Sequence, residues 1–213
     1  MLSDDFLAPR RCLAEPIPEV FEAARLLNAA VDTHLTGARN AAAALIRQAD
    51  IDAITPWRHS IMGDVDLEIT RFREVEGAPP SLPKADRVQP RMPAVAEKRV
   101  IAERDGWRCR FCGMPVIEER VRRAMRKAYP EALRWGKRNA ERHAAFLCLW
   151  LQYDHVLPHS RGGDSSPENM VVACAPCNFG RGEWMFEEVG LIDPRTVPIQ
   201  HSSWDGLERF LKA

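Results

Sequence analysis

Residues 153–182 read YDHVLPHSRGGDSSPENMVVACAPCNFGRG. Their composition predicts a strand over 149–158, a polar loop, and a second short strand over 169–174. A helix is expected to follow, starting near Cys177 and running through CNFGRGEWMFEEVG. Neighbouring side chains of a strand point to opposite faces, so Asp154 and His155 should have different roles. The stretch therefore combines a carboxylate, an imidazole and the start of a helix in one small unit.

Two Cys-x-x-Cys pairs lie in and before this stretch, Cys109/Cys112 in RCRFCG and Cys174/Cys177 in ACAPCN. Such a turn lets two thiolates face one ion, and two turns complete the tetrahedral shell of a structural zinc. The pairs are 61 residues apart, farther than the ~15–20 of a compact zinc ribbon. Unliganded buried cysteines remain an alternative, whereas a thioredoxin-like redox pair is disfavoured because no βαβ pattern surrounds either turn. Four thiolates would leave zinc no open position, so we expect the chemistry elsewhere.

The composition is that of a soluble folded protein, with 46% hydrophobic and 28% charged residues in 213. No apolar run approaches the ~18 residues of a membrane helix, and the acidic N-terminus is unlike a secretory signal. We therefore expect a cytoplasmic protein with reduced thiols. The formal net charge is zero, but residues 97–182 hold 16 Lys and Arg against 10 Asp and Glu. A polyanionic partner is expected to bind there.

The rest of the chain is expected to be mainly helical. Helical periodicity covers residues 17–49, with a break near Gly37, and VDLEITRF at 65–72 alternates as a strand would. Another helix is expected over 94–106, and a basic helical segment over 117–147 with a break at Tyr129-Pro130.

These elements predict a helical N-terminal domain, a linker, a second domain and a tail. The linker is GAPPSLPKADRVQPRMP, whose five prolines predict an extended chain. The predicted ranges are 1–76 for the N-terminal domain, 77–93 for the linker, 94–190 for the second domain with its insert at 117–147, and 191–213 for a tail with a short amphipathic helix.

Residues 95–113, including RDGWRCRFCG, and residues 153–182 together resemble the zinc-stabilised form of the HNH endonuclease family. The resemblance covers about 50 of the 213 residues. It implies a ββα-metal core of two strands and a helix around one divalent ion, and hydrolysis of phosphodiester bonds in nucleic acid. The expected fold class is α+β, with a mainly helical N-terminal region and a ββα-metal nuclease domain that carries a basic helical insert and a four-cysteine zinc site.

The resemblance also implies roles for single residues. His155 resembles the general base that deprotonates the attacking water, and Asp154 and Asn178 resemble the ligands of the catalytic metal. Many relatives have histidine at the last position, and the asparagine here is typical of the variant that uses Mg²⁺ or Mn²⁺. Asn169 resembles the middle asparagine, which braces the loop and so orients His155.

Three further residues are candidates for nucleic-acid contact. Arg181, expected near a helix start, would reach a phosphate together with backbone N–H groups. His159 could contact metal or phosphate, or only pack the loop. Arg161 could contact the nucleic-acid backbone, although a solvated side chain is the simpler interpretation.

The spacing from Cys112 to Asp154 is longer than is usual for the family, because of the basic segment between them. That segment is either a solvated helical face or a helical hairpin along the nucleic acid, which would add salt-dependent phosphate contacts without sequence preference. Residues 1–76 could recognise a target, dimerise or bind a regulatory protein. DNA is the favoured substrate, and family habit suggests phage defence or restriction.

Two other functions compete with the nuclease. A zinc-dependent adaptor that binds nucleic acid without cutting would keep the cysteines and the basic segment. It would leave Asp154, His155 and Asn178 without a role, and their joint presence counts against it. A protein-interaction module built on the N-terminal helices, with a degenerate nuclease remnant, ranks third because no key position is missing.

Overall fold

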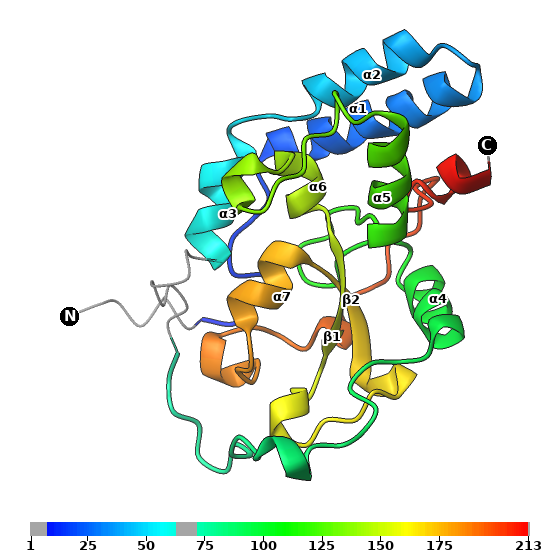
Figure 1. Ribbon diagram of the computed structural model, residues 1–213. Coiled ribbons are helices and arrows are strands. Elements are labelled where there is room, and N and C mark those ends of the chain that lie inside the picture. The colour runs from blue at the N-terminus through cyan, green and yellow to red at the C-terminus, as the bar shows by residue number, and fades with distance from the viewer. Residues whose placement is uncertain (1–7, 63–71, 213) are drawn as a thin grey trace.

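The computed structural model of the chain describes residues 8–62 and 72–212. It begins with a helical hairpin, α1 (Pro18–Leu35) and α2 (Arg39–Gln48), which lies along one end of the molecule (Figure 1). Apolar side chains of α1 recur at helical spacing on its buried face, as the periodicity predicts. Gly37 links the helices at φ 82°, a left-handed conformation that glycine adopts without strain.

A third helix, α3 (Ile54–Met62), was not expected from the sequence. It is short, carries a proline in its first turn, where the helix tolerates one, and packs against α6 and α7. The strand expected over 65–72 falls outside the described residues except for Phe72. That residue lies in no strand, and its ring stacks on Trp184 with centroids 3.8 Å apart.

Residues 72–94 run without α-helix or strand, with one 3-10 turn, η2 (Lys84–Asp86), before α4 (Val95–Arg104). The helix ends at Asp105, and Gly106 follows at φ 65°. A side chain at Gly106 would meet the carbonyl oxygen of Gln200 at 2.6 Å, so the turn both reverses the chain and allows the C-terminal segment to approach.

The basic segment is less helical than its sequence predicts. Helix α5 (Glu119–Ala128) stops before Pro130 as expected, but residues 129–143 form turns and the short η3 (Asn139–Glu141), and α6 (Ala144–Cys148) is a single turn and a half. The guanidinium groups of Arg122 and Arg142 lie 3.7 and 5.2 Å from the centre of the Trp135 ring. Packing around this tryptophan replaces the second helix of the expected hairpin.

The central unit is two antiparallel strands and a helix, β1 (Leu151–His155), β2 (Met170–Cys174) and α7 (Ala175–Arg181). The register pairs Leu151 with Cys174 and His155 with Met170. Helix α7 ends at Arg181, is followed by Gly182 at φ 59°, and is much shorter than predicted. The remaining elements are 3-10 turns: η4 (His159–Arg161), η5 (Pro167–Asn169), η6 (Glu187–Val189), η7 (Pro194–Thr196) and η8 (Glu208–Lys212), the last in place of the expected C-terminal helix.

The described part of the chain combines α-helices with one small antiparallel sheet, which confirms an α+β fold. One buried cluster extends from α1 through the sheet to η8, so the buried core crosses the expected boundary at 77–93. The division into domains therefore stays a prediction about folding units. No helix in the described ranges is long and apolar enough to span a bilayer.

Candidate active site and metal centre

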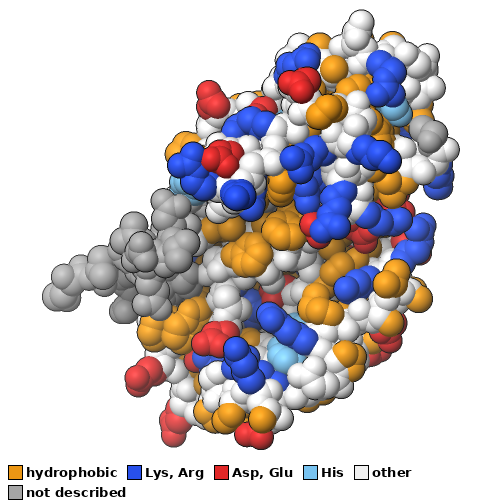
Figure 2. Space-filling view, in the orientation of Figure 1, with side chains coloured by type: hydrophobic (Ala, Val, Ile, Leu, Met, Phe, Trp, Pro, Cys, Tyr) orange, Lys and Arg blue, Asp and Glu red, His pale blue; other side chains and the backbone are white. Residues whose placement is uncertain are grey.

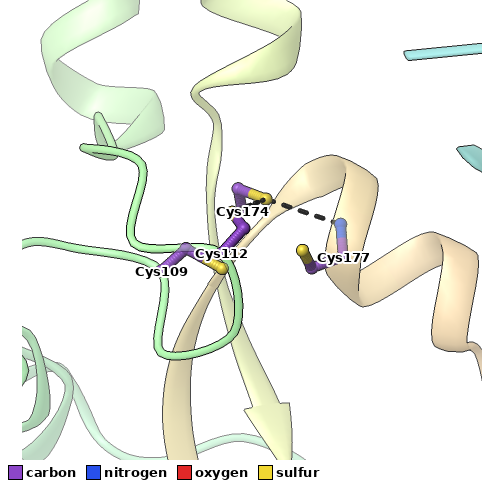
Figure 3. Close-up of side chains that lie close together, drawn as sticks. All are labelled: Cys109, Cys112, Cys174 and Cys177. Atoms are coloured by element: carbon purple, nitrogen blue, oxygen red, sulfur yellow. Dashed lines mark hydrogen bonds between the residues drawn. The ribbon is translucent and has the colours of Figure 1, made fainter. Parts of the chain in front are cut away.

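The four cysteines of the two pairs converge although 61 residues separate the pairs. Their sulfur atoms all lie within 4.8 Å of one another, and Cys112 Sγ is 3.7 Å from Cys174 Sγ. A tetrahedral zinc with Zn–S bonds of about 2.3 Å places its sulfurs about 3.8 Å apart. Figure 3 shows the pairs facing each other, one from the loop after α4 and the other from the junction of β2 and α7. The cluster is therefore compatible with a structural zinc.

Local hydrogen bonds shape both turns before any metal binds. Gly113, at φ 78°, donates its N–H to the carbonyl of Cys109 at 2.9 Å and closes the first turn. Cys174 caps α7, because its sulfur accepts the N–H of Cys177 at 3.4 Å. Glycine and a polar cap at these places are the sequence features that let each pair point inward.

Buried Asp105 and Arg110 attach the first turn to the sheet. The Asp105 carboxylate accepts the N–H of Val172 at 2.8 Å, and the N–H of Arg110 donates to the Val172 carbonyl at 2.8 Å. This pair of bonds holds the loop that carries Cys109 against β2. The four-cysteine cluster is therefore hydrogen-bonded to the strand that leads to α7.

Asp154, on β1, is buried and ion-paired with Arg181, the last residue of α7. Arg181 donates from Nη2 and Nε to the two carboxylate oxygens at 2.5 and 3.1 Å, and from the same Nη2 to the His155 carbonyl at 2.6 Å. Burial raises the pKa of Asp154 above its ordinary value, and Arg181 offsets part of that rise. The pair ties the C-terminus of α7 to β1.

His155 follows Asp154 on β1, and its side chain contacts the loop between the strands instead of Arg181. Its Nε2 lies 3.1 Å from Ser165 Oγ, and that hydroxyl donates to the Pro90 carbonyl at 3.0 Å. Burial lowers the pKa of His155 to about 4, with further lowering by His159, Arg91 and Arg181. The imidazole is therefore neutral at pH 7 and able to accept a proton.

Asn169 holds the loop between the strands. Its Oδ1 accepts the N–H of Leu157 at 2.8 Å, and its Nδ2 donates to the carbonyls of Asp164 and Leu157 at 2.8 and 3.2 Å. A side chain at Gly163 would meet Nδ2 of Asn169 at 2.8 Å, so the glycine permits this close packing. These contacts fit the bracing role that the resemblance implies for Asn169.

A cleft of about 370 Å³ opens over β1 and the end of α7. Asp154, His155 and Asn178 line it together, and Asn178 is half-buried at its wall. His159 and Arg181 complete the set of predicted residues found there. One cleft thus brings together the carboxylate, the imidazole and the amide that the sequence singles out.

Arg161 and His159 make contacts within the protein. Arg161 bonds the carbonyls of Glu183 and Pro79 and pairs with buried Glu188 at 2.9 Å. His159 Nε2 lies 2.6 Å from the carbonyl of Val88. Both side chains pack the loop in this structure.

Sequence reasoning missed Arg87 and Arg91, which line the same cleft from the segment expected to be a linker. It also missed Ser165 beside His155. The signal for the arginines was slight, two basic residues four apart in a proline-rich stretch. Ser165 stood among other polar loop residues, and nothing distinguished it.

Replacing Arg181 with methionine is expected to lower the free energy of unfolding by roughly 3–5 kcal/mol, because Asp154 would stay buried without its partner. Urea unfolding of the zinc-loaded protein measures this. The double variant Asp154→Asn/Arg181→Met is the matched control and should recover much of the loss. An Arg181→Met protein as stable as the parent would show that the pair does not support the fold.

Comparison with known families agrees with the geometry. Residues 148–182 match the family model of the HNH endonuclease, and this range contains both strands, the loop and all of α7. The match confirms the HNH resemblance over that segment and supports a nuclease. No curated protein and no solved structure matches the chain significantly.

Proposed function

We propose that this protein is an endonuclease that hydrolyses phosphodiester bonds in DNA, with His155 as the general base. The observation that carries the proposal is the single cleft in which His155, Asp154 and Asn178 meet on a ββα unit matching the HNH model. The neutral imidazole is in the state that accepts a proton from water at pH 7. Ser165 and the Pro90 carbonyl behind it fix the plane of the ring.

Asp154 and Asn178 are the side chains that we propose to hold a divalent cation, Mg²⁺ or Mn²⁺. Carboxylate and amide oxygens are hard ligands, and Mg²⁺ commonly takes only one or two carboxylates from protein and its other ligands from water and phosphate. Such a cation, when bound, would offset the charge that develops on the phosphate and the leaving oxygen. Arg181 already neutralises part of the Asp154 charge, so we expect weak metal binding without nucleic acid.

We propose that a zinc ion is held by the four cysteines, Cys109, Cys112, Cys174 and Cys177, and that it would keep β2 and α7 in place beneath the cleft.

Three further predictions also stay proposals. They are a cytoplasmic location, a role in phage defence or restriction, and a homo-oligomer or regulatory partner on the N-terminal helices. Figure 2 shows basic side chains over and around α5, outside the cleft. Within α5, Arg120, Arg122 and Arg123 pair with glutamates, so we propose that the exposed Arg126 and Lys127 contact a polyanion.

The test is cleavage of supercoiled plasmid by the purified protein, with Mg²⁺, with Mn²⁺ and with EDTA. We expect nicked or linear plasmid with either metal and none with EDTA. Cleavage that persists in EDTA would contradict the divalent-metal mechanism. Binding of DNA without cutting under any metal condition would favour the adaptor instead.

A further inference from the structure

Residues 79–92, which we call the strap, pack beside the cleft, and Arg87, Arg91 and Met92 line it. Three backbone contacts hold the strap to the loop between β1 and β2: the N–H of Leu82 donates to the Ser160 carbonyl at 2.6 Å, and the carbonyls of Val88 and Pro90 lie 2.6 and 3.0 Å from His159 Nε2 and Ser165 Oγ. A fourth contact joins the Pro79 carbonyl to Arg161 at 2.9 Å. The segment that composition predicts as a linker is therefore part of the candidate active site.

The strap brings two guanidinium groups into the cleft, those of Arg87 and Arg91. Arg87 is half-buried and bonds the Leu82 carbonyl through Nε at 2.9 Å. Arg91 is exposed, and within the described residues its side chain has no ion pair or hydrogen bond. Arg91 and His155 line the same cleft. Arg91 is thus a cation beside the proposed general base, with its donors free for a ligand.

The arginines expected from sequence to contact phosphate are bonded within the protein. Arg181 is 1% exposed and directs all three guanidinium nitrogens at protein oxygens, including both of Asp154. Arg161 is occupied by Glu188 and two backbone carbonyls. A phosphate that enters the cleft would meet the arginines of the strap first.

We propose that Arg91, assisted by Arg87, binds the phosphodiester backbone of the substrate, so that the nucleic-acid strand lies between the strap and the edge formed by β1 and α7. The inference rests on the proposed function, because it concerns the same cleft. Phe179, 47% exposed on the opposite wall, leaves an apolar surface for a sugar or a base. A planar guanidinium can bond two phosphate oxygens through a fixed pair of parallel N–H donors, a geometry that the ammonium of lysine does not offer.

A phosphate contact of this kind adds affinity without sequence preference and is sensitive to salt. Losing one such contact reduces the slope of log K against log salt by about 1. Arg91→Ala should therefore weaken binding to every DNA sequence by about tenfold at low salt and flatten the salt dependence. Arg91→Lys keeps the charge but not the paired donors, so its affinity should lie between that of the parent and that of Arg91→Ala.

The experiment measures the Kd of labelled single-stranded and duplex DNA of two unrelated sequences at several salt concentrations. It uses the full chain carrying His155→Ala, so that binding is read without cleavage. Arg91→Ala is compared in that background with Arg47→Ala, which removes an exposed arginine of α2, far from the cleft. Unfolding curves for each variant check that the fold is unchanged.

An Arg91→Ala protein with the affinity and salt slope of Arg47→Ala would overturn the inference, and so would absence of DNA binding by the His155→Ala background itself. The two proposals fail separately. If the parent cuts plasmid while Arg91→Ala binds normally, the nuclease stands without this contact. If nothing is cut but Arg91→Ala loses affinity, the phosphate site stands and the nuclease does not.

Discussion

His155→Ala is expected to slow DNA cleavage by roughly 10²–10⁴-fold, the usual contribution of a general base. The imidazole is 7% exposed on the cleft side of β1 and is neutral at pH 7, because burial and three nearby cationic or titratable side chains lower its pKa to about 4. Among the described residues, the other histidine that lines the cleft with Asp154 and Asn178 is His159, and its Nε2 contacts the carbonyl of Val88 in the strap. Removing the ring therefore removes the proton acceptor and leaves the scaffold in place.

The rate should be measured under single-turnover conditions with saturating protein, which separates the chemical step from binding. His201→Ala is the matched control, because it removes an exposed histidine of the C-terminal segment outside the cleft. Added imidazole should restore part of the rate of His155→Ala but not change the control. If His155→Ala cuts as fast as the parent, the assignment of the base is wrong.

Local signals in the sequence were enough to predict the ββα unit. The strands β1 and β2 and the loop between them follow from strand-like composition and turn residues within 30 residues, and the helix was expected to start near Cys177, close to the observed start of α7. The convergence of four cysteines follows from the chemistry of the two turns, although the 61 residues between them gave no geometric guide. Where residues interact with near neighbours, the pattern predicts the structure.

Long-range packing explains what the sequence did not predict. The strap contacts residues of the loop between β1 and β2 that lie about 70–80 positions later in the chain. Its five prolines predicted a free linker, because composition does not show that the carbonyls of Val88 and Pro90 contact this loop. The basic segment was predicted to be two helices with a break at Tyr129-Pro130, and the break is found, but turns packed on Trp135 stand in place of the second helix. Composition alone predicts neither the contacts of the strap nor the packing on Trp135.

Arg181 shows how a small error in helix length changes a role. A long helix after Cys177 would place Arg181 near its start, where N–H groups and a guanidinium could share a phosphate. The observed α7 ends at Arg181, and the side chain turns inward to the Asp154 carboxylate and the carbonyl of His155, the last residue of β1. A cation at a helix C-terminus is stabilised by the helix dipole, so this end also suits the ion pair.

Loss of the four-cysteine centre is expected to have the largest effect on stability. Structural zinc binds with an apparent free energy of roughly 10–16 kcal/mol in small domains, as large as the ~5–15 kcal/mol that stabilises a typical protein. Here β2, α7 and the turn at Cys109 meet at the cluster, so loss of the metal would remove the bonds that join these three segments. Cys174→Ser should therefore lose the metal and lower the Tm by roughly 10 °C or more.

The measurements are zinc content per chain after gel filtration and the Tm with and without a strong chelator. Cys148→Ala is the matched control, because it removes another fully buried thiol while leaving the four ligands intact. The control should keep one zinc per chain, and the chelator should lower its Tm as it does for the parent. Cys174→Ser should contain no zinc, and the chelator should not change its Tm. A Cys174→Ser protein that retains zinc and melts with the parent would contradict a structural centre. Because this variant should destabilise the fold and His155→Ala should not, comparing the two separates the scaffold of the cleft from its chemistry.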